Sequence, residues 1–346
     1  MVKFNPGMAP STVNNSNFTV TGPFGAEAGQ VSFNASDNSA TWITQPTSTR
    51  DQRGPDLAMV SNYTATISGI SGGSHSFTFQ TGPCNGAYPA TTQIYDVPNS
   101  NLTAINGINN NGVMVGTYAV SGGQFWSGFI LNNGQLTTLE GPGWKINDSG
   151  AVAGTYTPNG LQRGFMFQSG KSTDIVDPQA TASQDQNWAF GINNSGVIVG
   201  YYVENQAGTG QTLKVSGYIR QADGTFQDIN PVAEDINNNG HVVGQDNNVT
   251  WIFNNGTYTN VTIPGGCGNI QGYGINDNDD TVGFAAGCPS LPSPWDGAYV
   301  KRGNNVYQVV VPGCTVVSAY GINNAGVVVG SCQNPKGNHG FIATPK

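Results

Sequence analysis

Short runs of alternating hydrophobic and polar residues follow one another along this chain, separated by Gly, Asn, Ser and Pro. Alternation with a period of two is typical of β-strands that bury one face, and no segment keeps the 3.6-residue period of an amphipathic helix. The C-terminal region shows the pattern well. Residues 307–312, 316–322 and 327–330 are three β-rich runs, and residues 340–342 begin a fourth. The pattern predicts an all-β protein.

One nine-residue phrase, Ile-Asn-(Asn/Asp)-x-(Gly/Asp)-x-x-(Val/Ala)-Gly, occurs six times. The copies, called repeats 1 to 6 in chain order, start at Ile108, Ile146, Ile192, Ile236, Ile275 and Ile322. Their spacings are 38, 46, 44, 39 and 47 residues. The Asn and Gly residues of the phrase suit a tight hairpin turn between two strands. Four short strands in a unit of this length are typical of a propeller blade.

The two ends of the repeat array favour a closed ring over an open solenoid. Repeat 6 ends soon after residues 341–342 and lacks the strand that follows the same position in the other repeats. Residues 93–98 supply such a strand before repeat 1. Pairing the two would remove an exposed sheet edge. We therefore predict that residues 91–346 form a six-bladed β-propeller closed by an N-terminal strand.

Residues 1–90 lack the repeated phrase. Residues 18–21, 30–33, 40–43, 63–67 and 76–79 alternate with a period of two, and turn-forming residues lie between them. This pattern predicts a small β-sandwich-like domain over residues 1–90. Its first 16 residues are rich in Pro, Asn and Ser and are expected to form an extended N-terminal arm.

The phrases at residues 191–200 and 321–330, each followed by Gly-(Tyr/Phe)-Ile, resemble the extracellular HAF-family repeat of bacteria. The resemblance covers roughly residues 93–346. Copies in that family usually carry His-Ala-Phe where this chain has Gly-Tyr-Ile or Gly-Phe-Ile, and only residues 338–341 come near that triplet. The resemblance implies a bacterial, secreted or cell-surface, β-propeller-like protein. It brings no established activity and no catalytic residues.

Charged residues make up only 9% of the chain, against about 25% in typical soluble proteins. The net charge is −8, and the 12 Lys and Arg residues are scattered. Without a basic stripe, nucleic acid is not an expected partner. No apolar run reaches the roughly 20 residues of a transmembrane helix, so we predict no transmembrane segment. The first residues also lack the apolar core of a signal peptide.

The five cysteines favour an oxidising location. Cys267 and Cys314 each stand eight residues before the Ile of their repeat, and Cys288 and Cys332 follow the last Gly of the same phrases. An antiparallel hairpin brings such positions together, which predicts the pairs Cys267–Cys288 and Cys314–Cys332; four buried free thiols are the alternative. Disulfides would place the protein outside the cytosol, extracellular or at the cell surface, with a signal peptide already removed. Cys84 would remain unpaired or bind another molecule.

Charged residues interrupt the repeats at two positions. The residue before the repeat Ile is Gly in four repeats, but Lys145 and Asp235 replace it in repeats 2 and 4. Five residues after the Ile, His241 and Asp280 replace Val or Ala. If the four side chains converged near a ring axis, they could support acid–base chemistry. They are weak catalytic candidates, and the alternative is that they are solvated residues flanking turns.

Three tryptophans are weak candidates for ligand binding. Trp126, Trp188 and Trp295 lie in polar or Pro-rich connections, where exposed rings could stack on sugars or anchor a protein. The alternative is that these loops fold over apolar patches. Trp144 shares its repeat position with Phe190, Tyr273 and Tyr320, which indicates packing between repeats.

No metal site or cofactor is predicted. Residues 277–280 offer calcium-like ligand types but lack the Gly and distal Glu of an EF-hand loop, so a plain acidic turn is the better interpretation. The three His residues are dispersed, which gives zinc no support.

The sequence thus predicts a secreted or cell-surface structural or adhesive protein, such as the subunit of an extracellular fibre or surface assembly. Its partners would be other copies of itself or surface glycans and proteins. One alternative is a carbohydrate- or protein-binding propeller module. Another is a hydrolase or lyase acting on a polysaccharide, and this requires the four charged residues to share one cleft. An enzyme is not the favoured interpretation.

Overall fold

The computed structural model of the 346-residue chain describes residues 2–3, 13–14, 16–22, 25–26, 29–34, 39–44, 62–70, 73–80, 87–120, 126–178, 180, 186–204, 214–229, 232–263, 267–287 and 297–346. All secondary structure in these ranges is β-strand, apart from one 3-10 turn, η2 (Pro158–Gly160). The predicted all-β class is therefore confirmed. Within the same ranges, no helix is long and apolar enough to cross a membrane.

The chain divides into two compact units. The first unit contains Met1–Gly86 with two later segments, Pro264–Cys267 and Cys288–Trp295. The second contains Ala87–Ile263, Gly268–Gly287 and Asp296–Lys346. Along the chain the division falls after residue 86, whereas the sequence placed it after residue 90. The two later segments were not predicted, since they are short and carry no strand pattern.

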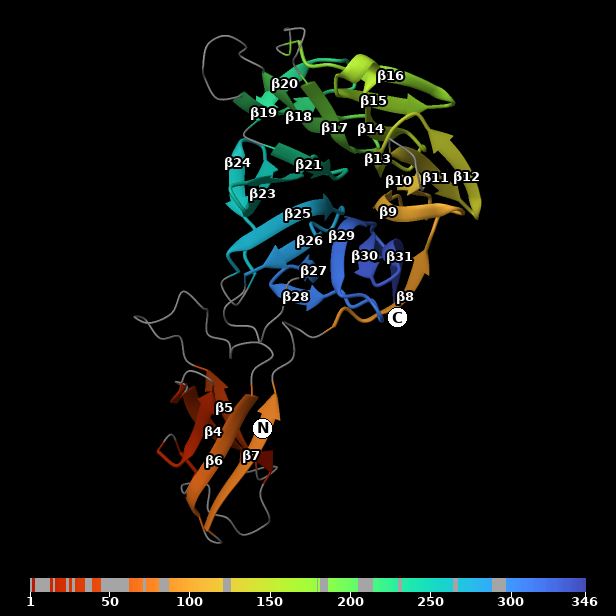
Figure 1. Cartoon of the computed structure of the whole chain (residues 1–346). Coiled ribbons are helices and arrows are strands. Elements are labelled where there is room, and N and C mark those ends of the chain that lie inside the picture. The colour runs from red at the N-terminus through yellow and green to blue at the C-terminus, as the bar shows by residue number, and fades with distance from the viewer. Residues whose placement is uncertain are drawn as a thin grey trace. The chain divides into compact units, whose positions relative to one another are not determined.

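The first unit contains two small sheets (Figure 1). One has the strand order β1-β5-β4, and its strands are β1 (Val2–Lys3), β4 (Gly29–Asn34) and β5 (Ser39–Thr44). The other has the order β3-β2-β6-β7, and its strands are β2 (Phe18–Gly22), β3 (Gly25–Ala26), β6 (Asn62–Ile70) and β7 (Gly73–Gln80). Phe18 and Val20 on β2 and Ala65 and Ile67 on β6 are buried, as alternation requires. Strand β1 belongs to the predicted N-terminal arm and pairs with β5 of the same chain. Residues 4–12 of the arm lie outside the described ranges.

The second unit is built from antiparallel strands (Figure 1). Each of repeats 1 to 5 contributes an inner strand, two middle strands and an outer strand, and repeat 6 contributes the first three. In repeats 1 to 3 these are β9 (Ser100–Ile108), β10 (Met114–Val120), β11 (Ser127–Asn132), β12 (Gln135–Leu139), β13 (Gly143–Ile146), β14 (Val152–Tyr156), β15 (Arg163–Gln168), β16 (Lys171–Ile175), β17 (Gln186–Ile192), β18 (Ile198–Glu204), β19 (Lys214–Arg220) and β20 (Phe226–Ile229). In repeats 4 to 6 they are β21 (Val232–Ile236), β22 (Val242–Asp246), β23 (Val249–Asn254), β24 (Thr257–Asn260), β25 (Asn269–Ile275), β26 (Thr281–Ala286), β27 (Gly297–Arg302), β28 (Asn305–Gln308), β29 (Val316–Ile322), β30 (Val328–Asn334), β31 (Gly337–Pro345) and β8 (Ala90–Tyr95).

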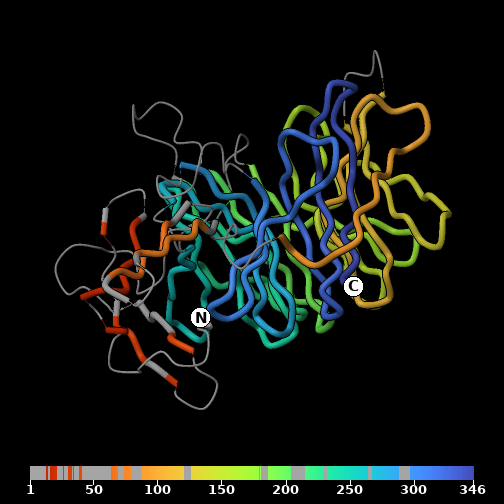
Figure 2. The backbone as a smooth tube through the Cα atoms, turned by 90° about the horizontal axis from the view of Figure 1, so that it is seen from below, coloured from red at the N-terminus to blue at the C-terminus, as the bar shows by residue number. Residues whose placement is uncertain are grey.

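Repeat 6 takes its outer strand from the start of the array. β8 pairs antiparallel with β31 from Tyr95 opposite Gly340 to Ala90 opposite Pro345. In Figure 2 the orange chain near residue 95 runs beside the blue C-terminal strands. One parallel pair, Asn338 with Leu102, also joins β31 to β9, so repeats 1 and 6 belong to one eight-stranded sheet. The long β31, which spans Gly337–Pro345, reaches β9 as well as β8.

The first Asn of the repeated phrase closes its own turn. In repeat 1 the side-chain Oδ1 of Asn109 accepts hydrogen bonds from the backbone N–H groups of Asn111, at 3.0 Å, and Val113, at 2.9 Å. Gly112 lies between them with φ +77°, a conformation that Gly adopts at little cost. Repeat 5 places Asp279 at this position with φ 59°. The phrase is thus a hairpin turn held by its own Asn side chain.

The same Asn also binds the next repeat. Its Nδ2 donates to the backbone carbonyl of the corresponding Asn, and the series returns to its start after six bonds. The donors are Asn109, Asn147, Asn193, Asn237, Asn276 and Asn323, and Asn323 donates back to Asn109, all at 2.9–3.2 Å. All six residues are buried. One side chain therefore satisfies its own turn and links two repeats, which explains why it is Asn in every copy.

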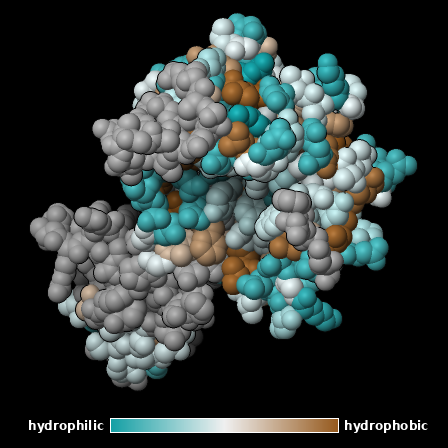
Figure 3. Space-filling model, turned by 45° about the horizontal axis from the view of Figure 1, so that its top comes forward, coloured by the Kyte–Doolittle hydropathy of each residue, from teal (hydrophilic) through white to brown (hydrophobic). Residues whose placement is uncertain are grey.

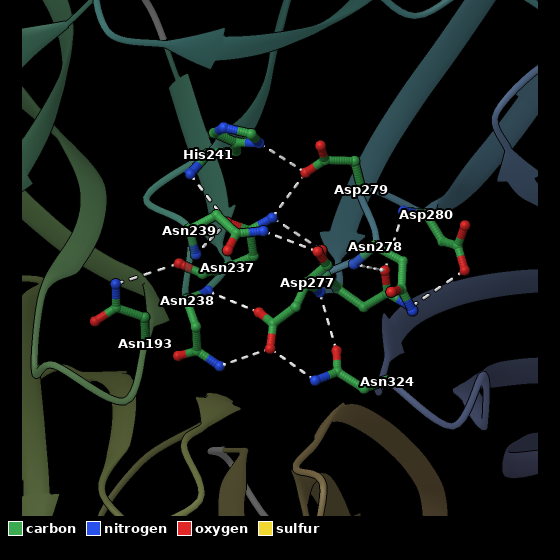
Figure 4. A network of polar contacts seen from close by, with 11 residues as sticks. Asn193, Asn237, Asn238, Asn239, His241, Asp277, Asn278, Asp279, Asp280 and Asn324 are labelled. Atoms are coloured by element: carbon green, nitrogen blue, oxygen red, sulfur yellow. Dashed lines mark hydrogen bonds and ion pairs between the residues drawn. The ribbon is translucent and has the colours of Figure 1, made fainter.

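A second cycle runs through the following residue of the phrase. Each backbone N–H donates to the side-chain Oδ1 of the corresponding residue in the next repeat, at 2.8–2.9 Å, through Asn110, Asp148, Asn194, Asn238, Asp277 and Asn324. Oδ2 of Asp148 accepts from the side-chain amides of Asn110 and Asn194. Oδ2 of Asp277 accepts in the same way from Asn238 and Asn324 (Figure 4). Two carboxylates thus organise four amides around the turns.

The last Gly of the phrase faces an aromatic ring on the neighbouring middle strand. The pairs are Gly116–Phe129, Gly154–Phe165, Gly200–Tyr218, Gly244–Trp251, Gly283–Tyr299 and Gly330–Phe341. A Cβ on Gly200 would lie 1.9 Å from the carbonyl oxygen of Trp188 on the inner strand. Because no side chain fits there, Gly recurs in all six copies and the rings fill the core beside it. Trp251 is accordingly 4% exposed.

The disulfide predicted within repeat 6 is present. Cys314 precedes β29 and Cys332 lies on β30, with 5.7 Å between their Cα atoms. The hairpin register, which places Val317 opposite Cys332, brings the two cysteines together. Cys267 is also disulfide-bonded. Its predicted partner Cys288 lies outside the described residues, as does Cys84.

Candidate ligand-binding site

The six inner strands surround a cavity of about 300 Å³ at one end of the second unit. The residue two positions before the repeat Ile contributes one lining side chain from each repeat. These are Asn106, Trp144, Phe190, Glu234, Tyr273 and Tyr320. We call this cavity the cup. Its volume lies at the lower end of the range for small-molecule sites.

The walls of the cup are two aromatic pairs. The rings of Trp144 and Phe190 meet edge to face with centroids 5.3 Å apart. Those of Tyr273 and Tyr320 do so at 5.4 Å. The order of the repeats around the hydrogen-bond cycles places repeats 2 and 3 across from repeats 5 and 6, so the two pairs face each other. Trp126, which is 54% exposed, lies at the rim.

Hydrogen bonds hold three of these rings in place. The indole Nε1 of Trp144 donates to Oγ1 of Thr155 at 3.0 Å. The hydroxyl of Tyr320 accepts from Ser331 at 3.2 Å, and the hydroxyl of Tyr273 donates to Gln271. Rings that are already oriented lose little conformational entropy when a ligand binds, which favours affinity.

Glu234 fills the gap between the two aromatic pairs on one side. It lies on β21, is half-buried, and accepts a 2.5 Å hydrogen bond from Nε2 of Gln245 on β22. Burial raises the pKa of Glu234 to about 7, although Gln245 and the charge of Lys145 act in the opposite direction. Burial, with a contribution from the charge of Glu234, likewise raises the pKa of Tyr201 to about 12.

The floor of the cup is an ion pair across the axis. Nζ of Lys145, from repeat 2, lies 3.9 Å from Oδ2 of Asp235 in repeat 4 and donates to the carbonyl of Tyr273 in repeat 5 at 2.7 Å. Both charged residues are buried. Burial raises the pKa of Asp235 to about 6, and Lys145 and the N–H groups of Ile275 and Ile236 oppose the shift.

The glycines that occupy this position elsewhere make room for the pair. A Cβ on Gly274 would lie 2.8 Å from the carbonyl of Tyr320, and a Cβ on Gly321 would lie 3.1 Å from the Cα of Gly107. The inner strands therefore approach closely at four repeats, and Lys145 and Asp235 occupy the remaining space on the axis. Beyond them a narrow channel of about 60 Å³ leads between the Asn and Asp side chains of the turns.

The structure brings together only two of the four charged candidates, Lys145 and Asp235. His241 lies at the turn, where its Nδ1 is 2.8 Å from Oδ1 of Asp279 (Figure 4). Asp280 accepts from Asn276 at 3.2 Å and pairs with Nε of Arg302 at 3.1 Å. The four side chains do not share one site, for a geometric reason. The residue five positions after the Ile follows the turn, whereas the residue before the Ile lies on the axis.

The acidic turn of repeat 5 forms hydrogen bonds within the protein. Asp277 binds Asn238 and Asn324, and Asp279 binds Asn237 and His241. Among the residues that the structure describes, no group of three or more His, Cys, Asp or Glu side chains is arranged to hold a metal ion. The carboxylates point to different partners, and the turn is maintained by these bonds.

Of the two candidate tryptophans that the structure describes, Trp126 borders the cup and Trp188 does not. Trp188 is half-buried and stacks on Tyr201 with centroids 4.5 Å apart. Trp295 lies outside the described residues. Trp144 packs between repeats, as its repeat position indicated, but it also lines the cup. Sequence reasoning missed Glu234 and Asn106. The signal was available, because both replace an aromatic residue two positions before the repeat Ile.

Comparisons with known proteins identify no family for this chain. No family model matches it, and no curated protein matches it. Among solved structures, it is similar to a candidate gluconolactonase, with 12% identity, TM-score 0.45, and coverage of 74% of this chain and 92% of the other. It is also similar to the β-propeller domain of the Trilobed protease from Pyrococcus furiosus, with 9% identity, TM-score 0.42, and coverage of 91% and 88%. A Bacteroides thetaiotaomicron protein of unknown function has 11% identity, TM-score 0.44, and coverage of 95% and 90%.

Proposed function

We propose that residues 91–346 form a six-bladed β-propeller, closed by β8, and that this propeller binds a carbohydrate in the cup. The two hydrogen-bond cycles through the turns and the β8–β31 pairing support the architecture. A small β-sandwich-like domain precedes the propeller in this proposal. The repeats are of the HAF type, which rests on the sequence resemblance alone.

The observation that carries the binding proposal is the facing pair of aromatic walls with an exposed Trp126 at the rim. Sugar rings present C–H faces that stack on aromatic rings, while their hydroxyl groups need a few polar partners. Glu234 and Asn106 provide polar groups between the walls. Figure 3 shows small brown patches separated by hydrophilic residues on the face in view.

A glycan array followed by calorimetry on the full chain tests this function. Trp126→Ala should weaken binding of the best glycan about 5- to 30-fold, the effect of losing one stacking contact. Phe77→Ala is the matched control, because Phe77 is 44% exposed, lies on β7 of the first unit and does not line the cup. Absence of glycan binding, or equal binding by Trp126→Ala, would overturn the proposal.

A secreted or cell-surface structural or adhesive role is a second proposal. It is supported by the Cys314–Cys332 disulfide, since disulfides persist in oxidising compartments, and by the low content of charged residues. Its partners would be copies of itself or surface glycans and proteins. Negative-stain microscopy of concentrated full-length protein tests it. Fibres or sheets would support the role, and particles that stay monomeric would contradict it.

A hydrolase or lyase that uses all four charged candidates has less support. Lys145 and Asp235 lie on the axis and pair with each other, while His241 and Asp280 bind separate partners at the turns. We therefore propose binding rather than catalysis for the cup.

A further inference from the structure

The charged groups at the cup carry an excess of negative charge. Lys145 and Glu234 line the cup, and Asp235, which pairs with Lys145, supplies the second carboxyl group. The ammonium lies against Asp235 and donates to the carbonyl of Tyr273. Its charge is thus largely compensated at the floor, and Glu234 in the wall remains the carboxyl group available to a ligand.

Glu234 also retains hydrogen-bonding capacity toward the cavity. Gln245 donates to Oε1, and no hydrogen bond to Oε2 is formed by the residues that the structure describes. Asn106, also in the wall, uses both N–H groups of its side-chain amide within the protein. Its Nδ2 donates to Thr117 at 2.7 Å and to the carbonyl of Gly143 at 2.9 Å. The principal polar feature that a ligand meets between the walls is therefore an acceptor with negative charge.

The aromatic walls favour the same kind of ligand. The faces of Trp, Tyr and Phe rings are electron-rich and attract a cation within about 6 Å of the ring centroid. Trp144 and Phe190 stand on one side of the cup, and Tyr273 and Tyr320 stand on the other. A carboxylate between facing aromatic rings is a suitable environment for an ammonium group.

On the premise that the cup binds a carbohydrate, we propose that its ligand is an amino sugar with a free, protonated amine. The amine binds Oε2 of Glu234, and the sugar ring lies between the aromatic walls. An N-acetylated sugar lacks the charge and presents an amide in place of the ammonium. A neutral sugar offers only hydroxyl groups to the carboxylate. The cup therefore distinguishes a free amine from both.

The electrostatics around Glu234 link binding to pH. The groups that face it are Gln245 on β22, Lys145 on β13, Asp235 on its own strand, Tyr201 on β18 and Tyr273 on β25. Burial raises the pKa of Glu234 to about 7 in the free protein. An ammonium ligand stabilises the carboxylate, so binding releases a proton from the protonated fraction. Affinity should rise from pH 5 to pH 7 while the amine remains protonated.

The test is calorimetry on the full chain with glucosamine oligomers, N-acetylglucosamine oligomers and glucose oligomers of equal length. The wild-type protein should bind the free-amine oligomer at least tenfold more tightly than the other two, the scale of one hydrogen bond to a charged group. Glu234→Gln keeps the size of the side chain and should remove this preference. Glu140→Gln makes the same charge change at an exposed residue and should retain it.

The outcomes separate this inference from the proposed function. If neutral and N-acetylated oligomers bind as tightly as the free-amine oligomer, and Trp126→Ala weakens all three, the cup binds carbohydrate but the amine selectivity is wrong. If Glu234→Gln binds the free-amine oligomer as the wild type does, the role of Glu234 is wrong. If no oligomer binds but the glycan array identifies another sugar, the amine selectivity is wrong; if the array also identifies none, the proposed function itself fails. Circular dichroism of each variant verifies that the fold is retained.

Discussion

The side-chain Nδ2 of Asn323 donates to the backbone carbonyl of Asn109 at 3.2 Å, across 214 residues of sequence. This bond joins repeat 6 to repeat 1, and the same bond joins every other pair of neighbouring repeats. In an open repeat array each unit depends only on its neighbours, and the end units can fray. Here the cycle of bonds gives each turn two neighbours, so we expect the repeats to unfold together.

A single Asn of this cycle should have a large effect on stability. Asn147→Asp keeps the oxygen that accepts from Ser149 and Ala151 but removes the amide that donates to Asn193. It also places a carboxylate at a buried site. The free energy of unfolding should fall by about 1–3 kcal/mol. Urea unfolding measures this, and Asn304→Asp in an exposed turn is the control, with no expected change above about 0.5 kcal/mol.

The Cys314–Cys332 disulfide should stabilise the second unit. It links residues that are 18 apart in sequence and therefore restricts the unfolded chain. The double variant Cys314→Ser, Cys332→Ser should be less stable than the wild type by about 2–4 kcal/mol in urea without reductant. The difference should shrink when a reductant is added, since the wild type then loses the same link. An unchanged urea midpoint in the variant would contradict the prediction.

Glu234 should make stability depend on pH between its ordinary pKa of 4.5 and its pKa of about 7 in the folded chain. Below pH 4.5 Glu234 is protonated in both the folded and the unfolded state, so its burial costs no stability. As pH rises, the carboxyl group of Glu234 ionises first in the unfolded chain, so the folded state loses stability until about pH 7. Compared with Glu234→Gln, the wild type should become progressively less stable from pH 4.5 to pH 7. Urea unfolding at three pH values measures the difference, and Glu140→Gln should follow the wild type.

Asp148 should affect the pH dependence of stability in the opposite direction to Glu234. Partial burial alone would raise its pKa, but hydrogen bonds from Asn110 and Asn194 lower it below the ordinary value of 3.8. The stability that this carboxylate contributes is present above pH 3.8 and is lost as pH falls through the lower pKa of the folded state. Asp148→Asn should destabilise the protein at pH 7, and the difference from the wild type should narrow below pH 4. Asp246→Asn, at an exposed residue, should show no such narrowing.

Much of the local structure could be predicted because it depends on neighbouring residues. The alternating runs, the Asn-Asn-x-Gly turns and the spacing of Cys314 and Cys332 indicated the strands, the hairpins and one disulfide. The candidate site was less predictable. Lys145 and Asp235 were identified as departures from Gly, but His241 and Asp280 were grouped with them although they lie beyond the turn. Repeat alignment gives the position of a residue along a strand and leaves its distance from the axis undetermined.

The sequence by itself determined the all-β class and the six hairpin turns, since these follow from local backbone geometry and from hydrogen bonds within a few residues. Only the tertiary structure decided which of the residues that differ from the repeated pattern lie close together. Glu234, Lys145 and Tyr273 come from three repeats and share one cup because the inner strands are arranged around a common axis. The raised pKa of Glu234 has the same origin, because burial depends on what the other repeats place around the carboxyl group.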